Sequence, residues 1–287
     1  MNETEGEGNR ETRVAYQGAS GAYSEEAVYR ACGPSAVAIP YRENVEVARA
    51  LSSGDVELGL LPIENTLAGS VYVSYDAILS HPTIVAVAEL VLPIHHCVLG
   101  VDGATMKSLR VVESHPVALA QCAKFFARHP SIVARAVYDT AGAALEVSRA
   151  KDPTRGALAS RLAASHYGLA ILESDVEDRP DNQTRFLVLS RRRAQLDEGI
   201  RARTLLVVTT ENKPGALLRV LAPLAERSLN LVKLEARPTG EPWTYRFVLE
   251  IEHHAGDPSM DEALGVIAAN SQSLRHVGTY AVSRWQG

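Results

Sequence analysis

Cysteine is scarce in this chain, and its spacing argues against two common stabilising devices. Only three cysteines, Cys32, Cys97 and Cys122, occur among 287 residues, and none of them forms a C-x-x-C pair. An odd number of cysteines without that spacing favours neither a disulfide framework nor a zinc cage. We therefore expect a cytoplasmic protein that folds without staples.

Long apolar runs and an excess of basic residues are lacking as well. The best apolar run, IVAVAELVLPI from Ile84, is shorter than the roughly 18 to 20 residues of a membrane helix and contains Glu89. The net charge of -5 argues against a nucleic-acid partner. The acidic stretch MNETEGEGNRET has no apolar core, which predicts a disordered leader over residues 1–12 and not a signal peptide. Neither a membrane nor a nucleic acid is an expected partner.

Motifs for cofactors are also missing. The segment GASG at residues 18–21 lacks the dinucleotide fingerprint G-x-G-x-x-G, and no P-loop motif occurs in the chain. The neighbouring pairs His95-His96 and His253-His254 would point to opposite faces of a strand, so each pair chelates one metal poorly. We expect no cofactor and no metal.

The pattern along the chain predicts two domains, as the length also suggests. From residue 14 to about 189, short apolar runs alternate with amphipathic stretches, which is typical of α/β units with a largely parallel sheet. Ser24 is expected to cap a first helix, and another helix is expected from Pro116 to about Arg128. The arginine-rich stretch 191–203 has no apolar period and is predicted to be a linker. Beyond it, the order βαββαβ over 204–287 predicts a ferredoxin-like domain.

Polar clusters lie where predicted strands end and helices begin. They occupy residues 18–24, 62–70, 114–116, 139–142 and 181–185. Open α/β sheets bind ligands at the carboxyl ends of their strands, and helix N-termini there favour anions. A small carboxylate is the natural ligand. Each cluster taken singly is better explained by turn and cap chemistry than by a binding site.

The stretch DNQTRFLVLS at residues 181–190 is harder to explain as a turn. Thr184 favours strand geometry, and Arg185 beside it offers a fork for carboxylate recognition. A strand-edge hydroxyl with an exposed arginine is the alternative. Arg185 is expected either to bind a substrate carboxylate or to pair with an acid across the cleft.

Ordered motifs make residues 14–190 resemble prephenate dehydratases. They are GASGAYSEEA, LPIENTLAGSV, ESHPVALAQC and NQTRF, and the later segments NKPGALLRVL and LEARP resemble the ACT regulatory domain attached to that enzyme. The resemblance implies a catalytic domain over 13–190 with a two-lobed α/β fold like that of type II periplasmic binding proteins. Its first lobe would span about 13–90 and 178–190 and its second about 91–177, with a cleft between them and an ACT domain over 204–287.

The family reaction, implied by the same resemblance, converts prephenate to phenylpyruvate, water and carbon dioxide without a cofactor. Thr184 matches the family's essential threonine and would donate a hydrogen bond to the departing hydroxyl. Matching residues thought to line the cleft are Glu64, Asn65, Ser114 and Gln121, with Glu64 either a general acid or a simple cap or ion-pair carboxylate. Residues expected to bind the substrate are Ser20, Thr140, Arg185 and Phe186.

The resemblance also implies feedback by L-phenylalanine at paired ACT domains, acting on the cleft through the arginine-rich linker. Residues expected at the effector site are Asn212, Gly215, Ala216, Leu217, Leu218, Glu235 and Arg237. Ala236 departs from the serine common in the family, which removes a hydroxyl contact. A homodimer or homotetramer through the ACT domains is expected. Only twelve residues precede Arg13, which predicts a monofunctional enzyme without a chorismate mutase segment.

Two other functions remain open at this point. Arogenate dehydratase performs the same elimination on the amino analogue. A non-catalytic small-molecule-binding protein would also have a two-lobed α/β cleft, although the sequence has no signal peptide and no DNA-binding helix.

Overall fold

The computed structural model describes residues 11–283, so most of the expected leader over residues 1–12 lies outside the described residues. The described chain divides into two compact units. One comprises residues 11–82 with Leu90–Val188, and the other comprises Thr83–Glu89 with residues 189–283. Within residues 11–283, no helix is long and apolar enough to cross a bilayer.

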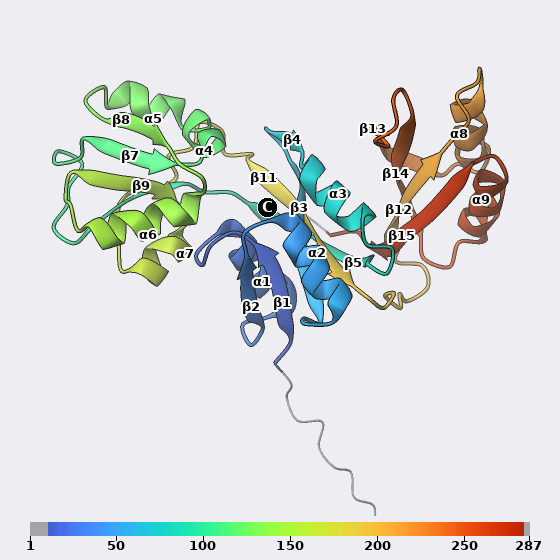
Figure 1. Ribbon diagram of the computed structural model, residues 1–287, viewed down its shortest axis with the longest axis horizontal. Coiled ribbons are helices and arrows are strands. Elements are labelled where there is room, and N and C mark those ends of the chain that lie inside the picture. Colours follow the sequence, from blue (N-terminus) through green and yellow to red (C-terminus); the bar gives the residue numbers. More distant parts are fainter. Residues whose placement is uncertain (1–10, 284–287) are drawn as a thin grey trace, which may run out of the picture. The chain divides into compact units, whose positions relative to one another are not determined.

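The first sheet has the strand order β2-β1-β3-β11-β5, with the short β4 paired to β3 (Figure 1). β1 runs parallel to both β2 and β3. Three consecutive residues of β1, Val14 to Tyr16, are fully buried, as expected where helices cover both faces of a sheet. The strands are β1 (Arg13–Gln17), β2 (Val37–Tyr41), β3 (Leu58–Asn65), β4 (Gly69–Ser70), β5 (Val85–Pro93) and β11 (Gln183–Ser190). The helices are α1 (Tyr23–Cys32), α2 (Asn44–Ser53) and α3 (Tyr72–Leu79).

The second sheet has the order β10-β6-β9-β7-β8 and combines parallel and antiparallel pairs. Its core is apolar and small-residue rich, with Leu99, Ala144 and Ala157 fully buried. The strands are β6 (Cys97–Gly100), β7 (Val111–Ser114), β8 (Val133–Ala136), β9 (Arg155–Ala159) and β10 (Ala170–Glu173). The helices are α4 (Pro116–Ala120), α5 (Ala123–Arg128), α6 (Thr140–Ala150) and α7 (Arg161–Tyr167).

The chain crosses between these two sheets twice. It leaves the first sheet after β5 through residues 94–96 and returns through residues 174–182 to form β11. Backbone hydrogen bonds join the crossing segments, from Ile94 N to Asn182 O at 2.9 Å and from Val176 N to His96 O at 3.0 Å. The two crossings therefore run side by side, and both covalent connections between the two sheets pass through them (Figure 1).

Two local predictions are wrong. Ala22, not Ser24, is the N-cap of α1, and Ser24 is buried inside the first turn. The helix expected from Pro116 to Arg128 is broken at Gln121 and Cys122 into α4 and α5. The break has a tertiary cause, because Asp178 from the returning segment caps α5 by accepting from Ala123 N and Lys124 N.

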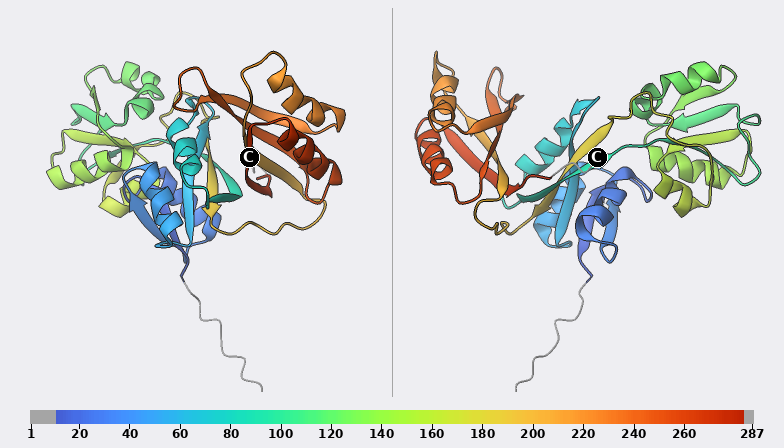
Figure 2. Two further views of the ribbon diagram at one scale, coloured as in Figure 1. Left: turned by 45° about the vertical axis from the view of Figure 1, so that its right-hand side comes forward. Right: turned by 180° about the vertical axis from the view of Figure 1, so that it is seen from behind.

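The other unit contains the predicted order βαββαβ. Its strands form an antiparallel sheet in the order β13-β14-β12-β15, and its two helices pack on one face of that sheet (Figure 2). Leu206, Val220 and Ile267 are among the fully buried residues of this core. The elements are β12 (Arg201–Thr209), α8 (Ala216–Glu226), β13 (Asn230–Pro238), β14 (Tyr245–His254), α9 (Pro258–Ala269) and β15 (Ser273–Ala281). Together with the two sheets described above, this arrangement confirms the predicted fold class.

The segment Thr83–Glu89 belongs to the same unit through specific contacts. Glu89 accepts from the Arg203 guanidinium at 2.8 Å, and Arg275 donates to Ile84 O at 3.0 Å. Gly278 lies so close to this segment that a Cβ atom there would clash with Ala86 O. The apolar run that begins at Ile84 thus contains the strand β5, whose first residues belong to this unit.

Candidate active site

A cavity of about 560 Å³ opens between the two sheets of the first unit. Strand ends of the first sheet contribute Gln17, Asn65, Thr184 and Phe186, and the remaining walls come from both lobes. The size is within the range of sites for small ligands. The other lining residues are Gly18, Ala22, Tyr23, Ser24, Pro62, Ala68, Gly69, Ser70, Val71, Val73, Ile94, His96, His115, Val117, Ala118, Gln121, Tyr138, Asp139 and Thr140.

The electrostatics of the cavity come from the backbone more than from charged side chains. No lysine or arginine is among the lining residues, and Asp139 is the one acidic side chain there. Its carboxylate is already engaged as the N-cap of α6, accepting from Ala141 N at 2.9 Å and from Ala19 N at 3.2 Å. The first residues of α1 and α6, Tyr23 and Thr140, both line the cavity. Helix N-termini attract anions, so the cavity suits a small carboxylate.

Thr184 is held by Asn65 at the floor of the cavity. The Asn65 side-chain nitrogen donates to Thr184 Oγ1 at 3.0 Å, while its oxygen accepts from Leu67 N and Ala68 N at 3.0 and 2.9 Å. An amide nitrogen only donates, so Thr184 Oγ1 accepts in this contact. The hydroxyl proton of Thr184 is therefore available to a ligand.

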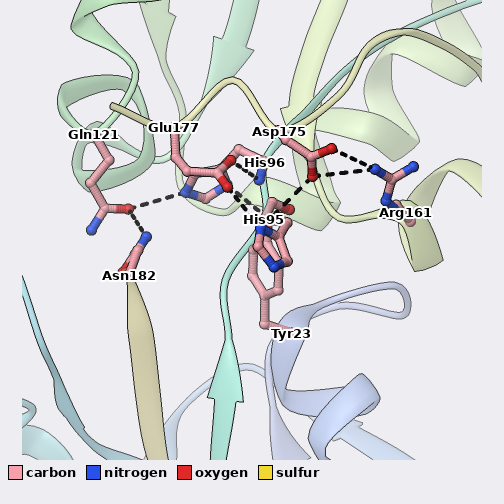
Figure 3. A network of polar contacts seen from close by, with 8 residues as sticks. All are labelled: Tyr23, His95, His96, Gln121, Arg161, Asp175, Glu177 and Asn182. Atoms are coloured by element: carbon pink, nitrogen blue, oxygen red, sulfur yellow. Dashed lines mark hydrogen bonds and ion pairs between the residues drawn. The ribbon is translucent and has the colours of Figure 1, made fainter. Parts of the chain in front are cut away.

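A polar network at the chain crossings continues from this pair (Figure 3). The Asn182 amide nitrogen donates to Gln121 Oε1 at 3.1 Å, and the same oxygen lies 3.0 Å from His96 Nε2. The other ring nitrogen of His96, Nδ1, is 2.7 Å from the Tyr23 hydroxyl. His96 is almost fully buried, and that burial lowers its pKa below the ordinary value. Burial likewise raises the pKa of Tyr23 well above its ordinary value.

The structure gathers five of the predicted site residues around the cavity. These are Asn65, Gln121, Thr140, Thr184 and Phe186. Thr184 and Phe186 lie two positions apart on β11, so they face the same side of the strand.

Four predicted site residues lie outside the cavity lining. Arg185 projects to the other side of β11 and pairs with Glu64 at 2.8 Å. Ser114 is fully buried and donates to Leu158 O at 2.6 Å. Ser20 lies between the lining residues Gly18 and Ala22, and its carbonyl accepts from the Tyr167 hydroxyl.

Three residues of the cavity and its polar network, Tyr23, His96 and Asn182, were not predicted individually from the sequence. Tyr23 and Asn182 belong to polar clusters that were noted only as groups, and His96 was considered only as a metal ligand. A sequence signal existed for Tyr23 and Asn182, since both belong to motifs at strand ends. None identified His96, because its partners come from α1, the α4–α5 break and the returning segment.

One group within residues 11–283 has the composition of a metal site. His95, Asp175 and Glu177 bring one ligand atom each within 4.8 Å of one another. The carboxylates have partners already, since Glu177 accepts from His95 and from His96 N, and Asp175 pairs with Arg161 at 3.0 Å (Figure 3). The geometry is that of an ion-pair network at the crossings.

The second unit has its own cavity, of about 500 Å³. Three of the predicted effector residues, Asn212, Ala216 and Leu217, line it. Residues between Thr239 and Phe247 contribute another part of its wall. Gly215, at φ +77°, is the N-cap of α8. Leu218, Glu235 and Arg237 are not among the lining residues, and Leu218 is exposed.

Fold and site together define a two-lobed α/β protein with a cleft for a small anion and a separate ferredoxin-like domain. The family model of prephenate dehydratase matches residues 14–194, and that of the ACT domain matches residues 204–269. The chain belongs to the prephenate dehydratase family and carries an ACT domain, which confirms the resemblance read from the motifs.

Individual relatives agree with this assignment. Arogenate dehydratase/prephenate dehydratase 2 of Arabidopsis thaliana is 37% identical over 292 residues, covering 98% of this chain and 76% of the relative. The structure of a prephenate dehydratase from Arthrobacter aurescens in complex with L-Phe has a TM-score of 0.88 at 28% identity, covering 94% of this chain and 90% of that one. The structure of GqqA, described as a novel type of quorum quenching acylase, has a TM-score of 0.87 at 33% identity, covering 94% and 98%.

Proposed function

We propose that this protein converts prephenate to phenylpyruvate by decarboxylating dehydration. The observation that carries the proposal is the Thr184 hydroxyl, which accepts from Asn65 and keeps its own proton for a ligand in the cavity. A hydroxyl so placed donates to a departing oxygen without presenting a charge to the carboxylates of a dianionic substrate.

The main contribution of the protein to this reaction is to hold the substrate in the reactive geometry. The bond between the ring and its carboxylate breaks, the released electron pair enters the ring, and the C4 hydroxyl leaves with the electrons of its C–O bond. Carbon dioxide is released, the leaving hydroxide takes a proton to become water, and the ring becomes aromatic. Holding the dianion at helix N-termini in this geometry contributes several kcal/mol, on the order of 7 to 11 in favourable cases.

The test compares Thr184→Val with Thr184→Ser by following phenylpyruvate absorbance. Thr184→Val keeps the shape but removes the donor, so kcat falls about 100-fold or more while KM changes little. Thr184→Ser keeps the hydroxyl and retains much of the activity. Parental kcat in Thr184→Val would rule out the assigned role, and a parent that releases no phenylpyruvate would rule out the reaction and leave a binding protein.

Arogenate is the alternative substrate, because the Arabidopsis relative is named for both substrates. Its extra ammonium group would meet Asp139, the acidic side chain of the cavity lining. The ratio of kcat/KM for the two substrates, measured side by side, decides between them.

Acylase activity is a second candidate, because the GqqA structure is described by that activity. Hydrolysis of an acyl bond requires a nucleophile or water activated by a base. The partner of Thr184 is the Asn65 amide nitrogen, which donates and takes no proton. The geometry favours elimination, and an assay for acyl-chain release tests the alternative directly.

We further propose that L-phenylalanine binds the ACT domain and inhibits the enzyme in the cytoplasm. The cavity at the start of α8 includes Asn212, Ala216 and Leu217, and the remaining predicted contacts, Glu235 and Arg237, would be supplied by pairing of ACT domains in a homodimer or homotetramer. Inhibition requires that the effector bind two states of the enzyme with different affinity. Initial rates that stay flat as phenylalanine rises to millimolar concentration would contradict inhibition.

A further inference from the structure

A series of hydrogen bonds runs through the chain crossings, and the donor and acceptor of each bond can be assigned from its neighbour. The series joins Asn65, Asn182, Gln121, His96 and Tyr23. It starts at the backbone amides of Leu67 and Ala68, which donate to Asn65 Oδ1. This contact fixes which end of the Asn65 side chain is oxygen, because a backbone N–H has no acceptor role. Asn65 Nδ2 must then face three acceptors, which are Asn182 Oδ1 and Gln183 O, both at 2.9 Å, and Thr184 Oγ1 at 3.0 Å, and these share its two hydrogens.

The same logic passes to the next residues. Since Asn182 Oδ1 accepts from Asn65, its Nδ2 faces Gln121 and donates to Oε1 at 3.1 Å. Gln121 Oε1 is therefore an acceptor, and the second group that reaches it is His96 Nε2, at 3.0 Å. Two acceptors cannot satisfy each other, so His96 carries its proton on Nε2 and donates to Gln121.

Tyr23 closes the series at its far end. With the proton on Nε2, His96 Nδ1 has a lone pair and accepts from the Tyr23 hydroxyl at 2.7 Å (Figure 3). The lowered pKa of buried His96 and the raised pKa of Tyr23 agree with a neutral imidazole and a protonated phenol. The Tyr23 hydroxyl has one proton, and His95 O at 2.9 Å competes with His96 Nδ1 for it, so the tautomer of His96 follows from its contact with Gln121.

This assignment leaves two donors at the cavity. Thr184 Oγ1 accepts from Asn65, and within residues 11–283 its proton has no acceptor. Gln121 Oε1 accepts from His96 and Asn182, and in the same part of the chain the Gln121 Nε2 hydrogens have no acceptor either. Both residues line the cavity. If any residue in this series exchanged its donor and acceptor roles, a neighbouring amide would have to flip to keep its hydrogen bond.

We propose that His96 is a positioning residue which holds the Gln121 side chain in one orientation, so that its N–H groups stay aimed as donors at the substrate beside the Thr184 hydroxyl held by Asn65. It does not touch the reacting atoms of prephenate in this role. The inference rests on the proposed dehydratase reaction, which supplies the departing hydroxyl and the carboxylates that these donors meet.

His95 provides a matched control next to His96 in the chain. Its side chain is 48% exposed and pairs with Glu177 outside the series of hydrogen bonds. Only its backbone carbonyl approaches Tyr23, at 2.9 Å, and that group survives any substitution of the side chain. His95→Leu and His96→Leu therefore remove the same ring from neighbouring positions with different expected effects.

The kinetic test measures kcat and KM of the parent, His96→Leu, His96→Gln and His95→Leu. His96→Leu should lose up to about 100-fold in kcat, because a misaimed donor costs rate more than binding. His96→Gln supplies an amide N–H to Gln121 and should recover most of the loss, and His95→Leu should keep the parental kcat. Parental kcat in His96→Leu, or equal losses in all three variants, overturns the proposal.

A spectroscopic test needs neither substrate nor turnover. Histidine ¹⁵N labelling of the parent, with the His96 signals assigned by their loss in His96→Gln, should give the Nε2–H tautomer. The Nδ1–H tautomer would overturn the proposal even if His96→Leu failed to fold. A parent that turns over no prephenate but has the expected tautomer would instead overturn the proposed function, and with it the kinetic role given to His96.

Discussion

Asn65 donates to Thr184 Oγ1 over 3.0 Å, and the same side chain is anchored on the opposite side by the amides of Leu67 and Ala68. The hairpin from β3 to β4 thus determines which way the hydroxyl on β11 can donate. The two residues are 119 positions apart in the chain. Their contact brings the PIEN motif and the TRF motif together at the candidate active site.

Replacing Asn65 by aspartate tests this contact with a minimal change of shape. In Asn65→Asp the oxygen facing Thr184 can only accept, so the Thr184 hydroxyl turns to donate to it and the leaving group loses its donor. We expect kcat to fall about 100-fold or more. The added negative charge should also raise KM for a dianionic substrate. Steady-state kinetics measure both constants, and a kcat equal to that of the parent would contradict the assigned geometry.

The Arg185–Glu64 pair predicts an effect on stability and little effect on substrate binding. Arg185 lies outside the cavity lining and is largely buried against Glu64. Arg185→Gln should lower the free energy of unfolding by about 1 to 3 kcal/mol and leave KM nearly unchanged. Chemical denaturation and kinetics on the same preparation measure the two effects.

Glu64→Gln is the matched control for that prediction. It keeps an acceptor for Arg185 and removes only the charge, so its loss of stability should be smaller. A KM that rises more than about tenfold in Arg185→Gln but not in Glu64→Gln would mean that Arg185 binds a substrate carboxylate after all.

Buried His96 predicts a pH dependence of stability. Its folded-state pKa is lowered by burial, whereas in the unfolded chain it titrates near the ordinary value of about 6.5. As pH falls through that value, the unfolded state binds a proton that the folded state does not, so the free energy of unfolding decreases. Above the unfolded-state pKa the effect is absent, since His96 is neutral in both states.

Denaturation of the parent and of His96→Gln at pH 7.5 and pH 5.5 isolates this contribution. The groups facing His96, among them Tyr23, Gln121, Glu177 and His95, are present in both proteins. The parent should lose more stability between the two pH values than His96→Gln, by up to about 1.4 kcal/mol for each unit by which the pKa is lowered. Equal losses would show that His96 titrates normally in the folded protein.

Because Ala236 has no hydroxyl, we expect phenylalanine to inhibit the enzyme only weakly. Adding one hydroxyl at this position should strengthen the inhibition. The residue is exposed on β13, and the resemblance to ACT domains leads us to expect serine at this position. Ala236→Ser restores one hydrogen-bonding group and should lower the half-inhibitory phenylalanine concentration severalfold, since one hydrogen bond is worth about 1 kcal/mol. Inhibition curves of parent and variant measure it, and Ala236→Val, which adds bulk without a hydroxyl, serves as the control.

Individual site residues could be predicted from motifs in the sequence, whereas the long-range hydrogen bonds between those residues could not. Motifs at strand ends identified Thr184, Asn65 and Gln121, because helix N-termini and strand ends have turn and cap signals that are readable in one sequence. Ser114 belongs to such a motif too, yet its hydroxyl is used by Leu158 O across the second sheet. Which of several polar residues in a motif faces the cavity depends on neighbours that are distant in the chain.

Long-range contacts explain the other misses. The break at Gln121 and Cys122 has no glycine or proline signal and follows from Asp178, which caps α5 from the returning segment. The run from Ile84 was considered only as a possible membrane helix, while it forms β5, the strand next to β11 at the end of the first sheet. The sequence does not indicate the role of the His96 ring, because the groups around it come from three distant parts of the chain. These groups are Tyr23 on α1, Gln121 after α4, and Asn182.

The position of β11 in its sheet has a consequence for how the enzyme is made. β11 lies between β3 and β5, although all strands of the second lobe precede it in the chain. A nascent chain leaving the ribosome therefore has a gap in the middle of its first sheet until the second lobe has emerged. The strand that fills this gap also carries Thr184, so the last step in assembling the scaffold delivers the group that works on the substrate.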